Sequence, residues 1–330
     1  MKKSILMLTT GGTISSRESE EGLVPSGADE ILAHIGSAAE QVLLDTRELL
    51  TLDSANIQPE EWRIIAGAVF EGFGRYDGIV VTHGTDTMAY TSSAVSFMLR
   101  NPPVPVVFTG SQLPISSPLT DATLNLRRAF AMAQSGHSGV FVVFDRKVIL
   151  GARAVKVRTR GFDAFDSINC DCAGVFTGKG LTVNENVLVK PDGPPKLCDD
   201  LDTNVFLLKL TPGMNPDIID RLIASGCSGL VLETFGLGGV QLIRRDFIAA
   251  LERANVLSIP VVACSQCLYE APDFSLYQPG RLILKAGVIN GRDMTIEAAV
   301  TKLMWALGQT RDREEIRGTF ETDLAGEVTV

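Results

Sequence analysis

Two turns rich in glycine and threonine constrain the fold of this chain more than any other feature. Each follows a short apolar run typical of a buried strand: residues 4–8 (SILML) precede the turn at 9–14, and residues 78–81 (GIVV) precede the turn at 82–87. In an α/β sheet, a strand that ends in a tight glycine turn presents the next side chains at the carboxyl edge. The two turns therefore predict an α/β protein with a site built from threonine hydroxyls.

The first half of the chain alternates apolar segments with helical patterns. We expect strands at residues 4–9, 78–82, 104–109, 139–144 and 147–150, and helices at residues 28–35, 59–73, 86–99 and 122–134. Pro59 with Glu60 and Glu61 is typical of a helix start, since proline loses no hydrogen bond there and acids favour the positive end of the helix dipole. Short, wholly apolar strands separated by helices predict a parallel sheet covered on both faces.

The alternation breaks at residues 190–203 (KPDGPPKLCDDLDT), where three prolines, a glycine and a run of acids indicate a domain boundary. It then resumes, with expected strands at 205–210, 229–233 and 259–263 and expected helices at 216–224, 245–254, 295–307 and 312–317. We predict two doubly wound α/β domains. The larger N-terminal domain spans 1–190, a linker spans 191–203, and the smaller C-terminal domain spans 204–330.

The formal net charge of −9 argues against a nucleic-acid partner, because binding to a phosphate backbone needs clustered Lys and Arg. No run approaches the roughly 20 apolar residues of a membrane span, so we expect no membrane association. The first residues could imitate a secretory signal, but their apolar stretch is short and ends in TTGG instead of a cleavage site. A cytoplasmic location is therefore expected.

The six cysteines leave a metal site and structural thiols as alternatives. Cys170 with Cys172 and Cys264 with Cys267 could together supply four zinc ligands, yet a four-thiolate site usually uses paired C-x-x-C turns in polar segments. Cys264 instead ends an apolar strand, where a free cysteine acts as a small buried hydrophobe. The pattern favours reduced structural thiols over zinc binding or redox activity, and we expect neither a metal nor a cofactor.

Threonine is the best candidate for the reactive group. Of the three histidines only His83 lies in one of the two turns, and no Gly-x-Ser-x-Gly motif is present, which disfavours a Ser-His-Asp hydrolase. A threonine hydroxyl needs a base or a nearby positive charge to act as a nucleophile. Thr85 and Asp86 place a hydroxyl beside a carboxylate, although either could simply cap the helix expected at 86–99. Lys156 could supply the amine or could be a surface charge, and its sequence position does not show that it reaches Asp86.

Several segments spread over the chain match the motifs of one enzyme family. They are residues 10–14 (TGGTI), 83–91 (HGTDTMAYT), 109–114 (TGSQLP), 161–165 (GFDAF), 286–288 (AGV), 294–295 (MT) and 302–303 (KL). In combination they resemble the signatures of the bacterial-type L-asparaginases, and the similarity spans essentially the whole chain. The chain is most similar to the cytoplasmic type I branch, in agreement with the expected location.

The resemblance implies hydrolysis of L-asparagine to L-aspartate and ammonia without a cofactor. Thr13 occupies the position of the nucleophile that forms an acyl-enzyme. Thr85, Asp86 and Lys156 match the group that activates the nucleophile or the water. Backbone N–H groups around Thr85 are expected to hold the oxyanion.

The resemblance also implies a set of residues that bind the substrate. Ser54 belongs to the loop expected to bind the α-carboxylate and the amine, Asp86 can pair with the substrate ammonium, and Ser111 corresponds to a position that contacts the amide through its backbone carbonyl. The full expected set is Gly12, Ser54, Ala55, Gly84, Thr85, Asp86 and Ser111.

Three positions depart from the family pattern. Leu23 stands where many members carry a tyrosine on a lid over the site, and leucine cannot relay a proton. Gly239 stands where members often place an asparagine that reaches a neighbouring subunit. Glu233 aligns with an arginine that some type I enzymes use in a second, allosteric site, so we do not expect that regulation here.

As partners, the resemblance implies a homodimer or homotetramer in which the C-terminal domain of one subunit completes the site of another. Two alternatives remain open. One is an amidohydrolase for another substrate, such as L-glutamine or a transamidation intermediate, although nothing in the chain resembles an added tRNA-binding domain. The other is a catalytically weak asparagine-binding sensor on the same fold, which Leu23 makes conceivable.

Overall fold

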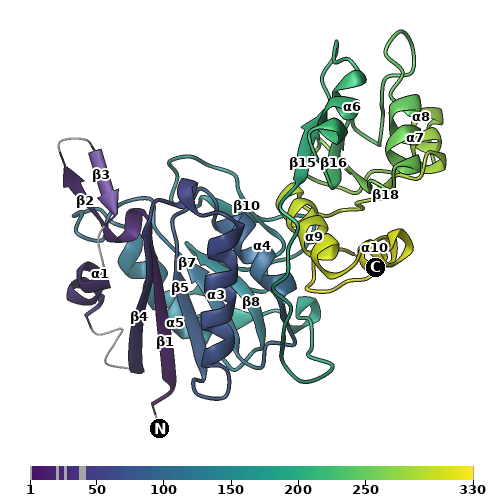
Figure 1. The fold of residues 1–330 in the computed structure, drawn as a ribbon. Coiled ribbons are helices and arrows are strands. Elements are labelled where there is room, and N and C mark those ends of the chain that lie inside the picture. Colours follow the sequence, from purple (N-terminus) through teal and green to yellow (C-terminus); the bar gives the residue numbers. More distant parts are fainter. Residues whose placement is uncertain (1, 20–21, 26–27, 37–41, 330) are drawn as a thin grey trace. The chain divides into compact units, whose positions relative to one another are not determined.

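The computed structural model describes residues 2–19, 22–25, 28–36 and 42–329. The chain divides into two compact units, Met1–Asp199 and Asp200–Val330. Each unit is built from a β-sheet and helices, and the first is the larger (Figure 1). The predicted fold class, two α/β domains of unequal size, is therefore confirmed.

The N-terminal unit contains an eight-stranded sheet in the order β13-β12-β9-β8-β7-β5-β1-β4. Its strands are β1 (Ser4–Gly11), β4 (Leu43–Leu52), β5 (Gly78–Thr82), β7 (Pro105–Thr109), β8 (Gly139–Phe144), β9 (Lys147–Leu150), β12 (Gly174–Thr177) and β13 (Gly180–Val183). From β4 to β8 all neighbours are parallel, as expected from their apolar sequences. Strand β4 was not predicted, because its mixture of polar and apolar residues is half-exposed at the edge.

The other edge of this sheet is antiparallel, so the prediction of a purely parallel sheet is wrong there. Strands β8 and β9 pair in opposite directions, and β12 and β13 continue in the same manner. Asp145 and Arg146 are the only residues between β8 and β9, and Asp145 has a positive φ of 48°. A connection this short permits only a hairpin, because a parallel crossover needs about a dozen residues or more.

Helices cover both faces of the sheet. They are α1 (Ala28–Ile35), α3 (Pro59–Gly72), α4 (Met88–Met98) and α5 (Ala122–Ala133). One face of the sheet, with Met7 and Val80, packs against Leu126 of α5. The other face includes Leu6 and Ile79, whose side chains lie beside α3.

Helix α3 begins where its sequence predicts. Gln58 and Glu61 form a capping box, in which the Gln58 backbone N–H donates to Glu61 Oε2 at 2.8 Å. Two of the residues that identified this helix, Pro59 and Glu61, thus have the expected structural roles.

Short elements complete the N-terminal unit around the main sheet. They are η1 (Thr13–Ser15), the hairpin β2 (Ser16–Ser19) with β3 (Gly22–Pro25), η2 (Ser54–Asn56), β6 (Leu99–Arg100), β10 (Ala154–Lys156), β11 (Phe165–Ser167), η3 (Glu185–Val187) and β14 (Lys196–Leu197). Three of these, η1, η2 and β10, follow the main strands and carry predicted site residues.

The C-terminal unit is a four-stranded parallel sheet, β15 (Val205–Lys209), β16 (Gly229–Thr234), β17 (Val261–Ser265) and β18 (Ile289–Asn290), in that order. Its helices are α6 (Asp217–Ala224), α7 (Ile248–Val256), α8 (Gln278–Lys285), α9 (Ile296–Gln309) and α10 (Arg313–Glu321). Helix α8 was not predicted, because proline and glycine in its first turn suggest a loop. Within the described residues, no helix has both the length and the apolar character to cross a bilayer.

A buried ion pair ties the end of the chain to α9. Lys302 and Glu327 are fully buried and paired with each other. Lys302 Nζ also donates to the Thr322 carbonyl at 2.9 Å, and the Ala325 backbone N–H donates to Glu327 at 2.7 Å. Burial and the neighbouring Glu327 raise the pKa of Asp323 to about 6. The segment after α10 is therefore part of the interior of the C-terminal unit.

His83 ends the buried row of β5 and is completely buried in a neutral form. Its Nδ1 lies 2.7 Å from the Gly84 carbonyl, which can only accept, so Nδ1 carries the proton. Burial lowers the pKa of His83 to about 4, against the hydrogen bond to Gly84, which raises it. His83 therefore remains uncharged at neutral pH and acts as a packing group.

This burial predicts a pH-dependent loss of stability. Below pH 6.5 the unfolded chain protonates His83 more readily than the folded chain does, so the free energy of unfolding falls as the pH drops from about 6.5 to 4. Between pH 7 and 4.5 we expect this group to contribute a loss of about 2 kcal/mol. Urea unfolding of the wild type and of His83→Asn at both pH values measures it. An equal pH dependence in the two proteins would contradict the prediction.

Candidate active site

Four turns meet at the carboxyl edge of the N-terminal sheet, after β1, β4, β5 and β7. Backbone hydrogen bonds join them in pairs: the Gly12 N–H donates to the Leu52 carbonyl at 2.9 Å, and the His83 N–H donates to the Thr109 carbonyl at 2.8 Å. The Thr10 hydroxyl adds a bond of 2.9 Å to the Thr82 carbonyl. The two threonine-rich turns are thus neighbours in space, as their parallel strands predicted.

Glycine backbones make the closest approach between these turns. Gly12 has a φ of 80°, and a Cβ atom there would collide with the backbone nitrogen and Cα of Gly84. A Cβ on Gly84 would lie 2.7 Å from Ser54 Oγ. A larger side chain is excluded at Gly12, because the backbone atoms of Gly84 cannot give way, and one at Gly84 would displace the side chain of Ser54. The structure therefore brings the predicted residues Gly12, Ser54 and Gly84 together.

Thr13 follows directly on this contact and opens the short helix η1. Its side chain is half-buried, while Ile14 beside it is fully buried. The Ser16 hydroxyl donates to the Gly12 carbonyl at 2.9 Å, and the Ser15 backbone N–H donates to the same carbonyl at 3.3 Å. The backbone on both sides of Thr13 is thereby held against the second turn.

Thr85, Asp86 and Lys156 form one hydrogen-bonded group. Lys156 Nζ donates to Thr85 Oγ1 at 2.8 Å and to Asp86 Oδ1 at 2.5 Å. Thr85 is buried, the Lys156 side chain is 18% exposed, and the Asp86 side chain is 66% exposed. The amine thus lies inside the site, while the carboxylate faces solvent and can meet a second cation. The sequence alone could not show this contact between Lys156 and Asp86.

The alternative in which Thr85 or Asp86 caps the following helix is wrong. Helix α4 begins at Met88, its N-cap residue is Thr87, and no side chain caps it. The Thr87 hydroxyl instead donates to the Ser54 carbonyl at 2.7 Å. Thr85 and Asp86 are therefore available to the site.

The loop after β4 lies directly beside the second turn. The Asp86 backbone N–H donates to Ser54 Oγ at 3.3 Å. Asp53 Oδ1 accepts from the Ala55 backbone N–H at 2.8 Å, which shapes the loop, and the Ala55 side chain is exposed. Both Ser54 and Ala55 thus lie at the same sheet edge as the threonine group.

The fourth turn carries Ser111 and two residues that the sequence analysis did not identify. The Ser111 hydroxyl donates to the Leu113 carbonyl at 2.5 Å. Asp121 accepts from the backbone N–H groups of Gln112, at 3.1 Å, and Leu113, at 3.2 Å. Asn125 donates to the Gly110 carbonyl at 3.0 Å and to Asp121 at 3.1 Å. Asp121 and Asn125 are four residues apart on one helix face, and this spacing was the signal available in the sequence.

The three residues that depart from the family pattern are Leu23, Glu233 and Gly239. Leu23 is in β3, where its backbone pairs with Glu18, and its side chain lies outside the described residues. Glu233 and Gly239 belong to the C-terminal unit. Glu233 is buried, and its carboxylate lies 3.4 Å from Lys209.

The cysteines are free thiols. Cys264 is buried on β17, and burial raises its pKa to about 12, so its thiol stays protonated and unreactive. Within residues 2–19, 22–25, 28–36 and 42–329, no group of three or more His, Cys, Asp or Glu residues could hold a metal ion.

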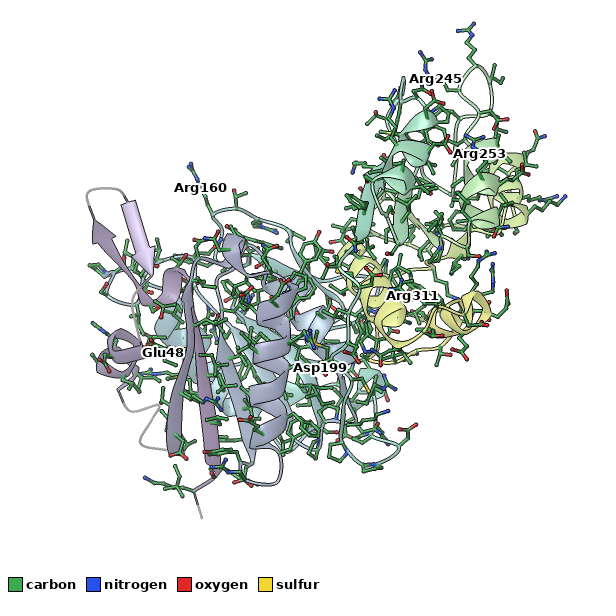
Figure 2. All side chains as sticks on the ribbon, in the orientation of Figure 1. Glu48, Arg160, Asp199, Arg245, Arg253 and Arg311 are labelled. Atoms are coloured by element: carbon green, nitrogen blue, oxygen red, sulfur yellow. The ribbon has the colours of Figure 1, made fainter. Side chains whose placement is uncertain are left out.

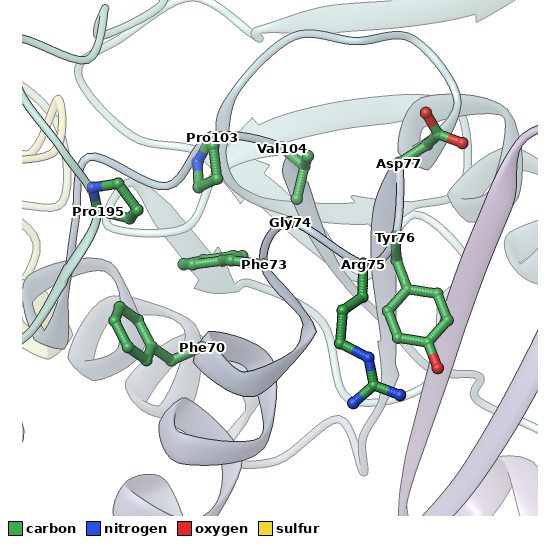
Figure 3. A pocket seen from close by; sticks show the side chains of 9 residues that line it. All are labelled: Phe70, Phe73, Gly74, Arg75, Tyr76, Asp77, Pro103, Val104 and Pro195. Atoms are coloured by element: carbon green, nitrogen blue, oxygen red, sulfur yellow. The ribbon is translucent and has the colours of Figure 1, made fainter.

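A groove of about 610 Å³ lies at the opposite end of the N-terminal sheet (Figure 3). Asp77 and Val104 line it, and they directly precede β5 and β7, whereas the threonine turns follow these strands. Phe70, Phe73 and Tyr76 supply its aromatic surface. The groove contains none of the predicted site residues, so we do not assign the chemistry to it.

Comparison with known proteins agrees with this geometry. Residues 4–188 match the family model "Asparaginase, N-terminal", and residues 204–320 match "Glutaminase/Asparaginase C-terminal domain". A protein of Thermococcus kodakarensis named L-asparaginase is 47% identical over 98% of this chain and 99% of its own length. A protein of Metallosphaera sedula, named as a component of glutamyl-tRNA(Gln) amidotransferase, is 38% identical over 98% of this chain and 76% of its own length.

Solved structures give the same result. The thermostable L-asparaginase of Thermococcus kodakarensis superposes with a TM-score of 0.94 at 46% identity, covering 99% of each chain. L-asparaginase I of Vibrio cholerae superposes with a TM-score of 0.90 at 32% identity, covering all of both chains. The chain therefore belongs to the asparaginase family of amidohydrolases.

Proposed function

We propose that this protein hydrolyses L-asparagine to L-aspartate and ammonia through an acyl-enzyme on Thr13. The observation that carries the proposal is the Thr85–Asp86–Lys156 group, held beside the Gly12–Gly84 contact that positions Thr13. The 47% identity to a protein named L-asparaginase supports the substrate.

In the first step, Thr13 Oγ attacks the carbon of the side-chain amide. The C–N bond breaks, the hydroxyl proton leaves with the nitrogen as ammonia, and an ester joins the aspartyl group to Thr13. We assign the stabilisation of the oxyanion on the carbonyl oxygen to backbone N–H groups around Thr85. To the Ser111 carbonyl we assign the role of accepting from the amide NH₂ and so aligning it.

In the second step, water attacks the ester and restores the Thr13 hydroxyl. Thr85 accepts a proton from the water and passes its own to the Lys156 amine, which must enter this step uncharged. Asp86 lies on the other side of the amine at 2.5 Å and stabilises the resulting ammonium. When the tetrahedral intermediate collapses, the bond between its carbon and Thr13 Oγ breaks, and Lys156 returns the proton through Thr85 to Thr13 Oγ. L-Aspartate then leaves as the carboxylate with release of one proton, and the protein returns to its starting state.

In this proposal the exposed carboxylate of Asp86 orients the substrate. The Asp86 carboxylate, 66% exposed, can pair with the substrate α-ammonium while it also accepts from Lys156. We assign the α-carboxylate to the loop of Ser54 and Ala55, with the Ser54 hydroxyl as the donor. A substrate with both groups at the α-carbon is therefore favoured over a simple amide.

Further proposals rest on the family resemblance. We expect a homodimer or a homotetramer in which the C-terminal domain completes the site of another subunit. We also expect the cytoplasm as the location and no nucleic-acid or membrane partner.

L-Glutamine or a transamidation intermediate is the second candidate substrate, because the chain is 38% identical to a protein named as a component of glutamyl-tRNA(Gln) amidotransferase. A sensor with weak catalysis is the third candidate. Ammonia release from L-asparagine and from L-glutamine, measured beside equilibrium binding of both, separates the three.

The first prediction of this proposal concerns the nucleophile. Thr13→Ala removes the attacking hydroxyl, so kcat for L-asparagine should fall at least about 10³-fold. Thr13→Ser retains a hydroxyl and should keep measurable turnover. Ammonia release in a coupled assay measures both. Equal turnover in wild type and Thr13→Ala would exclude Thr13 as the nucleophile.

The second prediction concerns the activating group. Lys156→Met removes the proton acceptor, and kcat should fall about 10²- to 10⁴-fold, the usual range for acid–base catalysis. Lys3→Met is the matched control, because Lys3 pairs with Asp77 at 3.1 Å at the end of the sheet opposite to the threonine turns. Its kcat should stay within about threefold of wild type. A Lys156→Met protein with wild-type kcat would disprove the assignment.

A further inference from the structure

We infer that Gln112 is a positioning residue: its side-chain amide joins the Thr85 hydroxyl to the loop that follows Lys156 and thereby sets the geometry of the Thr85–Lys156 pair. The effect on turnover rests on the proposed function. The effect on the geometry of the pair does not.

The amide bridges two segments that are far apart in the sequence. Thr85 Oγ1 donates to Gln112 Oε1 at 3.4 Å, and Gln112 Nε2 donates to the Gly161 carbonyl at 3.0 Å. A carbonyl can only accept, so the nitrogen must face Gly161 and the oxygen must face Thr85. Both ends of the amide are used, and its orientation is fixed.

This orientation determines where the Thr85 proton points. In the resting protein Lys156 Nζ donates to Thr85 Oγ1 at 2.8 Å, so the hydroxyl directs its own proton elsewhere until the amine becomes the acceptor in the second step. Gln112 Oε1 is the acceptor placed to receive it. The Thr85 lone pairs therefore remain directed toward Lys156 and the site.

The loop held by Gln112 is the one that carries Lys156. Strands β10 and β11 form a hairpin in which Lys156 pairs with Phe165, and residues 157–164 make its turn. Gly161 lies at the tip of this turn, where Arg158 pairs with Asp163 at 3.2 Å. The neighbouring Arg160 extends outward from the same loop (Figure 2). A bond to the Gly161 carbonyl thus restrains the turn from the side of the site.

Gln112 is itself anchored to a rigid element. Its backbone N–H donates to both oxygens of Asp121 at 3.1 Å, and Asp121 lies at the start of α5. The connection therefore runs from α5 through Gln112 to Thr85 on one side and to the Lys156 hairpin on the other. Without the amide, the distance between Thr85 and Lys156 depends on the hairpin and on the bond between Lys156 and Asp86.

Two substitutions of Gln112 distinguish the effect of losing its hydrogen bonds from the effect of adding a charge. Gln112→Met keeps the length of the side chain and removes both hydrogen bonds. Gln112→Glu keeps an acceptor for Thr85, loses the donor to Gly161 and adds a negative charge that holds a proton on the nearby Lys156 amine. Gln134→Glu is the matched control, because Gln134 also donates to a backbone carbonyl, that of Phe130 at 3.1 Å, but lies at the end of α5 that is remote from the turns.

The first readout needs no substrate. The three variants and the wild type are acetylated with acetic anhydride at pH 8, and the rate at Lys156 is followed by peptide mass spectrometry. We expect at least a threefold lower rate in Gln112→Glu and at least a threefold change in Gln112→Met, with Gln134→Glu unchanged. Equal Lys156 rates in all four full-length proteins would overturn the inference, whatever the enzyme does.

The second readout is turnover of L-asparagine across pH 6–10. We expect kcat of Gln112→Met to fall about 10- to 100-fold with KM changed less than threefold, and the rising limb of the Gln112→Glu profile to move to higher pH. A purely structural role would lower the thermal midpoint and leave the profile in place. If the wild type turns over L-asparagine and both Gln112 variants match it, the inference fails and the proposed function stands. If the wild type shows no turnover, the proposed function fails, and the acetylation rates decide the inference.

Discussion

The candidate site depends on one steric constraint, the direct contact between the backbones of Gly12 and Gly84. Parallel strands lie about 4.8 Å apart, so the turns that follow β1 and β5 meet unless side chains separate them. Glycine at both positions lets the backbones touch, and Ser54 fills the remaining space at Gly84. This approach brings Thr13 and Thr85 to the same place, because they are the residues immediately beyond the two glycines.

The sequence predicted the parallel centre of the N-terminal sheet and the meeting of its turns, because buried parallel strands are wholly apolar and glycine turns are conspicuous. It did not predict β4, whose half-exposed edge position permits polar residues, or α8, whose first turn contains proline and glycine. The position of Lys156 could not be predicted from spacing either. After β8 the chain reverses into β9, and the β10–β11 hairpin then returns the lysine to the site, so its placement depends on two chain reversals that the spacing of the sequence does not show.

The candidate site contains one buried uncharged ring, His83, beside the polar pair of Lys156 and Asp86. His83 is buried among apolar neighbours, and burial lowers its pKa to about 4, so the imidazole supplies shape and one donor to the Gly84 carbonyl. The Lys156 amine and the Asp86 carboxylate supply the charge, with the carboxylate toward solvent. His83 precedes Thr85 in the same turn, yet the structure gives it a packing role, and Lys156 from a separate hairpin supplies the amine that contacts Thr85 and Asp86.

The buried pair of Lys302 and Glu327 determines how the C-terminal unit responds to proteolysis of its last residues. Glu327 lies near the end of the sequence, and its carboxylate also accepts from the backbone N–H groups of Leu324 and Ala325. Proteolytic removal of these last residues would leave the buried Lys302 ammonium without its carboxylate partner. The last residues therefore belong to the interior of the C-terminal unit, and their removal would favour unfolding of the unit and further proteolysis.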